Sequence, residues 1–249
     1  MEWIVEKGLI GKMRRYEQEI KTADYETDHR LEMTPYALLS HCQEVAMEDL
    51  LALGCGHRDL FEHHSVFLLS RLALRIHRLP QSGEKAVFST WVTGTKGALF
   101  LRLSEVRGGD GELLAEGEAH WILVNPETRK ILRPQSFFLE FPVVPKQVGI
   151  QVEKFAFPEG MEACGEHRVR YSDLDCNGHV NNAGYVKMLY DFGLEDPFSA
   201  RIGEMQLYFA HEALLGEELQ FCRHREGDTL YFQVKSGERM CFGAQCREK

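Results

Sequence analysis

Residues 171–185 read YSDLDCNGHVNNAGY, a stretch that places two carboxylates, three amides and an imidazole directly before a short helical pattern. Asn181 or Asn182 can cap that helix, whose first N–H groups are unpaired and favour negative charge. Gly178 has no Cβ, so a ligand could approach the backbone closely, as a developing oxyanion requires. The stretch predicts either an active-site loop that activates water, or a hydrogen-bonded cap in which Asp and Asn satisfy turn backbone.

The same order of elements is predicted on both sides of this chain's midpoint. In the first half, Thr34 can cap a helix over residues 33–53 that carries a wide apolar stripe, and Gly54 can end it. Apolar alternation and short turns then predict strands at residues 66–79, 85–95, 98–107 and 113–125. The second half has strand patterns at residues 166–171, 202–211, 218–224, 229–235 and 240–246. Each half therefore has a predicted helix followed by several predicted strands, and this repeated order indicates an internal duplication.

Residues 141–165 lack the regular hydrophobic pattern of the two halves that they connect. Pro142, Pro145 and Pro158 interrupt the segment, and no strong period runs through it. We therefore expect an N-terminal domain at residues 1–140, a linker at 141–165 and a C-terminal domain at 166–249.

Composition excludes several classes of function. The chain has 249 residues, 44% of them hydrophobic, and its net charge of -9 argues against a broad nucleic-acid surface. No apolar run approaches the roughly 20 residues that span a bilayer. The 7 cysteines form no C-x-x-C pair, so free thiols in a reducing cytoplasm are expected, with no metal. No nucleotide-binding glycine motif occurs, so no cofactor is expected. The charged N-terminus carries no signal or transit segment, which predicts a cytoplasmic protein.

The stretch from Asp173 to Tyr185 resembles the signature of plant-type fatty acyl–acyl carrier protein thioesterases, D-L-D-x-N-x-H-V-N-N-x-x-Y. Residues 38–53, 66–76 and 121–129 also look like the first domain of that family. The missing transit segment suggests a bacterial-type member. The resemblance implies an α+β fold of two tandem hot-dog domains, each an antiparallel sheet wrapped around a central helix. In this family the first domain shapes the acyl tunnel.

The family's roles carry over by position. They fall on Asp175, Asn177 and His179 in the motif, and on Glu212 as the leading general base. Asp175 is a second candidate for the base. Gly178 and the backbone after it are candidates for the oxyanion hole. Residue parity from Glu204 through Glu212 would place the Glu212 side chain on one strand face.

The family's catalytic cysteine position holds Ala213 here, so a thiol nucleophile at that place is excluded. Hydrolysis by carboxylate-activated water is expected instead. Cys176, inside the loop but at a variable position of the motif, is a weaker alternative nucleophile.

The resemblance implies hydrolysis of fatty acyl–acyl carrier protein, with the acylated carrier protein as partner. An acyl-CoA thioesterase and a non-catalytic acyl-binding hot-dog protein are the alternatives. A hot-dog hydratase fits less well, because its D-x-N-x-x-H motif is one residue longer than the spacing found here. Basic residues such as Arg71, Arg75, Arg78 and Arg129 are candidates for a patch that meets the acidic carrier protein. The second half is short, so its sheet could be completed by a second copy of the chain, and a homodimer is a further possibility.

Overall fold

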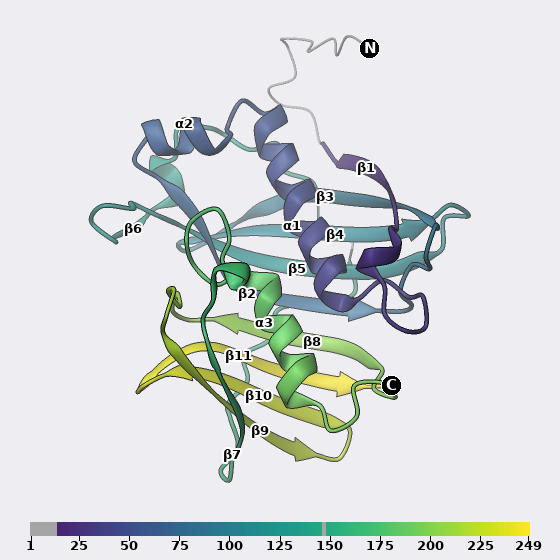
Figure 1. Cartoon of the computed structure of the whole chain (residues 1–249). Coiled ribbons are helices and arrows are strands. Elements are labelled where there is room, and N and C mark those ends of the chain that lie inside the picture. The colour runs from purple at the N-terminus through teal and green to yellow at the C-terminus, as the bar shows by residue number, and fades with distance from the viewer. Residues whose placement is uncertain (1–13, 146–147) are drawn as a thin grey trace.

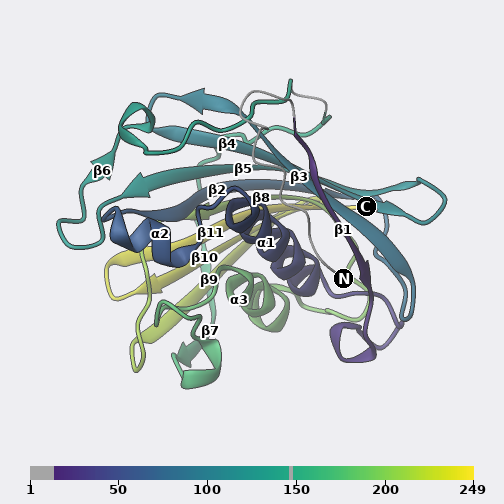
Figure 2. The ribbon, with the colours of Figure 1, turned by 90° about the horizontal axis from the view of Figure 1, so that it is seen from above.

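The computed structural model describes residues 14–145 and 148–249. One curved antiparallel sheet carries the main helices against one face (Figures 1 and 2). Helical elements are η1 (Asp24–Glu26), α1 (Pro35–Ala52), α2 (His57–Glu62), η2 (Pro134–Ser136), η3 (Tyr171–Asp173), α3 (Asn182–Met188) and η4 (Leu189–Gly193). Strands are β1 (Tyr16–Lys21), β2 (Val66–Ile76), β3 (Lys85–Lys96), β4 (Leu99–Gly108), β5 (Leu113–Val124), β6 (Ile131–Leu132), β7 (Glu162–Arg168), β8 (Ile202–Phe209), β9 (Glu218–Glu226), β10 (Thr229–Ser236) and β11 (Arg239–Glu248).

The strand order reveals the duplication. Strands run β1-β3-β4-β5-β2 in the first half and β8-β11-β10-β9-β7 in the second, so the second half reverses the order of the first. The halves join edge to edge where β2 pairs with β8, with Leu72 opposite Leu207 and Leu74 opposite Met205. All four side chains are buried in a core that both halves share. The predicted internal repeat is therefore confirmed.

Two capped helices lie side by side inside the sheet's curve (Figure 2). Thr34 caps α1, because its hydroxyl accepts from the Ala37 N–H at 3.4 Å, and Pro35 suits the first turn. Asn181 caps α3 by accepting from the Ala183 N–H at 2.8 Å. Asn182 Nδ2 donates to Gln43 Oε1 at 3.1 Å, which ties α3 to α1. The caps predicted from sequence are confirmed at Thr34 and Asn181.

Several predicted boundaries differ from the structure, and three of them bear on the site. β7 begins at Glu162, inside the segment predicted as a linker, because it pairs with β9 along Glu162–Arg168. Residue 171, predicted as the end of a strand, instead begins the turn η3, since the Asp173 carboxylate accepts from the Arg170 N–H at 2.7 Å. β8 ends at Phe209, so Glu212 lies beyond the strand and the parity argument does not place it.

A buried ion pair fixes α1 to the sheet of the first half. Asp49 on α1 and Arg102 on β4 are both buried, and Asp49 Oδ2 lies 2.8 Å from Arg102 Nη1. Burial lowers the pKa of the Arg102 guanidinium, and the Asp49 carboxylate acts against that shift. The position of α1 therefore depends on this contact as well as on apolar packing.

Asp49→Ala should lower the free energy of unfolding by about 3–5 kcal/mol, because Arg102 stays buried without its partner. Urea denaturation measures this difference. The double variant Asp49→Leu/Arg102→Met should recover most of the loss, because no buried charge is left without a partner. Arg14, which also pairs with Asp49 at 3.4 Å, is partly exposed and can be solvated. Equal losses in the two variants would contradict an electrostatic cause.

Candidate active site

The motif forms a closed turn around Asp175. Asp175 Oδ1 accepts from the backbone N–H of Asn177 at 2.8 Å and from that of His179 at 3.4 Å. The Asp175 N–H donates to the His179 carbonyl at 2.8 Å, and the Gly178 N–H donates to the Asp175 carbonyl at 3.1 Å. Gly178 has φ +79°, a left-handed conformation that glycine adopts without steric cost. The predicted hydrogen-bonded cap is therefore present, and the Gly178 N–H is engaged inside it rather than free to bind an oxyanion.

A second carboxylate holds the start of this loop. Asp173 Oδ2 lies 2.7 Å from His167 Nε2 and accepts from the Arg170 N–H. Burial by itself raises the pKa of Asp173, but these hydrogen bonds outweigh it and the net pKa is lowered. A lowered folded-state pKa contributes stability above the unfolded value of about 3.9, and this contribution is lost as pH falls through the folded value.

Glu212 reaches the loop through a short backbone pairing. The Val180 N–H donates to the Ala213 carbonyl at 3.0 Å, and His179 bridges to Leu214, so the chain after β8 runs beside the motif. His179 Nε2 lies 3.4 Å from Glu212 Oε2. Asn177 Nδ2 donates to Asp175 Oδ2 at 3.3 Å. The turn thus brings the imidazole of His179 against the carboxylate of Glu212, while Asp175 holds the amide of Asn177.

The first half contributes a cation to the same carboxylate. Arg129 Nη1 lies 2.8 Å from Glu212 Oε2. Arg129 stands in the turn between β5 and β6, where Asn125 accepts the Arg129 N–H through its carbonyl and the Thr128 N–H through its side chain. From the sequence, Arg129 is predicted only as one member of a basic patch. Its contact with Glu212 joins positions 83 residues apart and has no local signal.

A cavity of about 990 Å³ opens at these polar groups. Asp175, Asn177, His179 and Glu212 all line it, so the structure brings the four predicted side chains to one space. Its other walls come from α1, β2, β4 and β5 and are largely apolar, including Met47, Leu50, Phe67, Leu69, Phe100 and Phe141. A large, mostly apolar space whose lining includes these polar groups suits a ligand that has an alkyl chain and a reactive carbonyl.

Two residues of the cavity lining carry buried polar atoms for which the sequence gives no local signal. The hydroxyl of Tyr185 and the indole nitrogen of Trp121 are buried, and neither has a hydrogen-bond partner within the described part of the chain. Burial raises the pKa of Tyr185 and so keeps its hydroxyl protonated as a donor.

Two kinds of feature are not found among residues 14–145 and 148–249. No group of three or more His, Cys, Asp and Glu side chains gathers there so as to hold a metal ion. None of the helices in these ranges is both long and apolar enough to cross a bilayer.

Two family models match the chain in tandem. The acyl-ACP thioesterase N-terminal domain matches residues 13–138, and the acyl-ACP thioesterase C-terminal domain matches residues 159–245. A chloroplastic palmitoyl-acyl carrier protein thioesterase from Gossypium hirsutum is 24% identical over 198 residues, which are 74% of this chain and 47% of that protein. The chain therefore spans about half the length of the curated relatives it matches.

Solved structures share the whole fold. An acyl-ACP thioesterase from Bacteroides thetaiotaomicron aligns with a TM-score of 0.86 at 22% identity, covering 94% of this chain and 98% of that one. The 12:0-ACP thioesterase from Umbellularia californica aligns with a TM-score of 0.80 at 19% identity, covering 94% of this chain and 97% of that one. The expected α+β fold of two tandem hot-dog domains is confirmed.

Gly178→Ala should destabilise the protein by about 1–2 kcal/mol, because a Cβ disfavours the left-handed conformation. The midpoint of urea unfolding reports this change. Gly109→Ala is the matched control, since Gly109 lies in an open turn at ordinary φ and an added Cβ would meet nothing within 4 Å. A Gly178 variant as stable as the control would show that the turn relaxes freely.

Proposed function

Because the chain belongs to the acyl-ACP thioesterase family, we propose that it hydrolyses fatty acyl–acyl carrier protein to free fatty acid and carrier protein. The observation that carries the proposal is the contact of Glu212 with His179 in the lining of a large, mostly apolar cavity. A thioester needs little activation, because a thiolate leaves readily. The enzyme must supply a positioned water, a base and a dry place for the acyl chain.

Glu212 is the favoured base over Asp175. Both oxygens of the Asp175 carboxylate accept hydrogen bonds within the turn, so its role is to position Asn177 and His179. Arg129 and His179 both contact Oε2 of Glu212, and Oε1 has no partner among residues 14–145 and 148–249. Glu212 Oε1 can therefore accept a proton from water.

The reaction then proceeds in two steps. Water attacks the thioester carbonyl while Glu212 takes its proton, and the amide of Asn177 steadies the carbonyl or the water. The tetrahedral intermediate collapses with cleavage of the C–S bond, and the proton returns to the leaving sulfur through Glu212 or His179. No covalent acyl-enzyme is needed, which agrees with Ala213 at the family's cysteine position.

The carrier protein would meet the cavity mouth rather than the basic run on β2. Arg75 is paired with Glu204 and Glu116, and Arg78, which follows β2, is paired with Glu84 and Glu112. These pairs satisfy the guanidinium groups, so they present little free positive charge. The basic patch proposed from the sequence is therefore not supported at Arg75 and Arg78.

Glu212→Gln and His179→Ala should each lower kcat for acyl–acyl carrier protein hydrolysis by about 10²–10⁴, the usual contribution of general acid–base groups. Glu238→Gln repeats the same chemical change on the exposed β10–β11 turn and should keep full activity. Circular dichroism of each variant checks the fold. Full turnover by both site variants would refute the assignment.

The same assay separates the substrate classes. Acyl–acyl carrier protein and acyl-CoA of equal chain length, compared by kcat/KM, distinguish the proposed activity from an acyl-CoA thioesterase. Binding of acyl chains with no turnover of either substrate would instead identify a non-catalytic acyl-binding protein.

Arg129→Gln should lower kcat at most about fivefold, because an exposed ion pair contributes roughly 0–1 kcal/mol. We infer that Arg129 positions Glu212 and does not take part in proton transfer, so KM should change little. Arg129→Lys should restore part of the rate by keeping the positive charge. A loss as large as that of Glu212→Gln would contradict a positioning role.

A further inference from the structure

The turn around Asp175 has a counterpart in the first half, at residues 24–34. Asp28 Oδ1 accepts from the N–H groups of Arg30 and Glu32, as Asp175 Oδ1 does from Asn177 and His179. The Leu31 N–H donates to the Asp28 carbonyl at 3.0 Å, and Leu31 has φ +60°, so it repeats the conformation of Gly178. The Thr27–Met33 bridge repeats the Leu174–Val180 bridge. The same backbone turn is therefore present in both halves, around Asp28 in the first and around Asp175 in the second.

The side chains at this second place carry no hydrolytic chemistry. Arg30 stands where Asn177 does, and Glu32 stands where His179 does. The Met33 N–H donates to the Pro80 carbonyl as Val180 does to Ala213, so Leu79 occupies the position of Glu212. Arg30 binds Asp28 Oδ2 at 2.9 Å and Glu32 Oε2 at 3.2 Å, and it also donates to the Phe198 carbonyl. The general base and the imidazole are both replaced.

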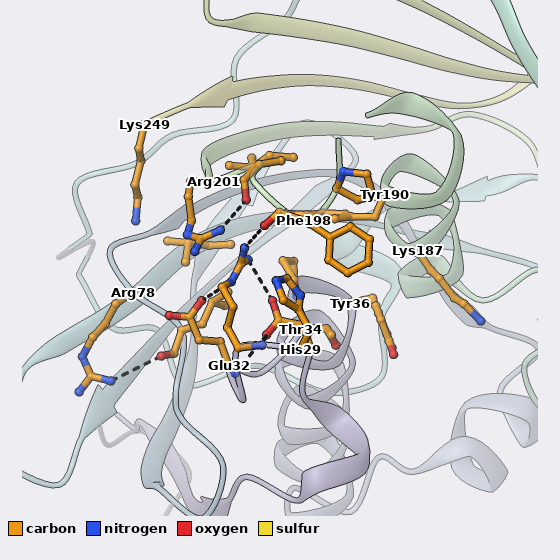
Figure 3. Close-up of a pocket in the computed structure, with 18 of the residues that line it drawn as sticks. His29, Glu32, Thr34, Tyr36, Arg78, Lys187, Tyr190, Phe198, Arg201 and Lys249 are labelled. Atoms are coloured by element: carbon orange, nitrogen blue, oxygen red, sulfur yellow. Dashed lines mark hydrogen bonds and ion pairs between the residues drawn. The ribbon is translucent and has the colours of Figure 1, made fainter. Parts of the chain in front are cut away.

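A cavity of about 690 Å³ nevertheless remains there, between the first-half turn and the segment that leads into β8. Figure 3 shows Arg201 and Lys249 on one side of it, and Phe198, Tyr190 and Tyr36 on the other. Ile76 and Ile202, both buried, also line the cavity. The cavity is therefore amphipathic: Arg201 and Lys249 lie on one side, and the aromatic rings lie on the other together with Lys187. The carboxylates of Asp28, Glu32 and Asp191 also belong to its lining.

Arg201 and Lys249 are available to a ligand. Arg201 Nη1 contacts only the carbonyls of Ser199 and Ala200, and Lys249 Nζ contacts the His77 carbonyl. Neither is paired with a carboxylate within residues 14–145 and 148–249. Arg30 and Arg78, which also line the cavity, are held by carboxylates. Arg201 and Lys249 thus give one side of an amphipathic cavity two cations without a carboxylate partner, and on that side they favour an anionic ligand.

We propose that this cavity is a second, non-hydrolytic binding site for an alkyl chain that ends in an oxyanion. Arg201 and Lys249 bind the oxyanion, whether a carboxylate or a phosphate ester, because a guanidinium and an ammonium suit both. The chain lies along Ile76 and Ile202 toward Phe198, which is 64% exposed and meets His29 edge-on at 4.7 Å. This site is distinct from the cavity at Glu212 and does not depend on hydrolysis there.

Isoleucine methyl NMR tests the proposal on the full chain, because the two cavities have separate reporters. Ile76 and Ile202 line the second site, and Ile122 lines the cavity at Glu212. Titration with laurate should shift the Ile76 and Ile202 methyl signals in a saturable way. Dodecyl phosphate should act likewise, and the stronger of the two ligands identifies the head group. Dodecyltrimethylammonium, with an equal chain and the opposite charge, should leave both signals in place.

Arg201→Glu/Lys249→Glu should weaken laurate binding at Ile76 and Ile202 at least about tenfold, while the response of Ile122 stays the same. Arg168→Glu, at an exposed arginine on β7, is the control and should bind as the unaltered chain does. An unchanged Ile122 response also shows that the double variant is folded. The proposal is overturned if laurate moves Ile122 alone, if the double variant binds normally, or if the alkylammonium shifts Ile76 equally. None of these outcomes bears on the hydrolysis assay.

Discussion

The antiparallel pairing of β2 with β8 is the constraint on which the rest of the molecule depends. It joins the two half-sheets into one, so that a single curved surface covers α1 and α3 together (Figure 2). Because the halves are related in reverse order across this seam, each motif turn meets an element of the other half. Arg129 of the first half reaches Glu212, and Arg30 of the first half reaches the Phe198 carbonyl of the second. Neither cavity would be complete within one half.

The sequence predicted most of what local chemistry determines. Caps at Thr34 and Asn181, the alternating strands and the order of the repeat all depend on neighbouring residues, and each is found in the structure. Asp175, Asn177, His179 and Glu212 were named through the resemblance, and they line one cavity. The end of β8 was missed, because alternation continues through Ala210 and Glu212 although the strand pairing ends at Phe209.

Contacts between the halves could not be predicted in this way. Arg129 lies in a turn whose sequence satisfies its own backbone, and nothing in that turn indicates a carboxylate from another domain. The engaged Gly178 N–H was missed for a different reason. Glycine at that position serves the left-handed turn, whereas the sequence argument assumed that the missing Cβ makes room for a ligand. The same turn formed with Leu31 in the first half shows that conformation, not space, is what the position demands.

The two copies of the turn differ at several side chains, and the charges of these side chains depend on one another. A carboxylate at residue 32, where the second half has His179, would lie against any acid at residue 79, and two like charges so close oppose ionisation of both. Leu79 removes that conflict. The remaining pair, Asp28 and Glu32, then needs a cation, and Arg30 supplies it in place of a neutral amide. Replacing Leu79 with glutamate while Glu32 is kept would add a carboxylate at the position that corresponds to Glu212. That carboxylate would have no imidazole beside it, because Glu32 stands where the second half has His179. The first-half turn thus keeps the backbone hydrogen bonds of the turn around Asp175, while its side chains form a different set of charges that is balanced within the turn.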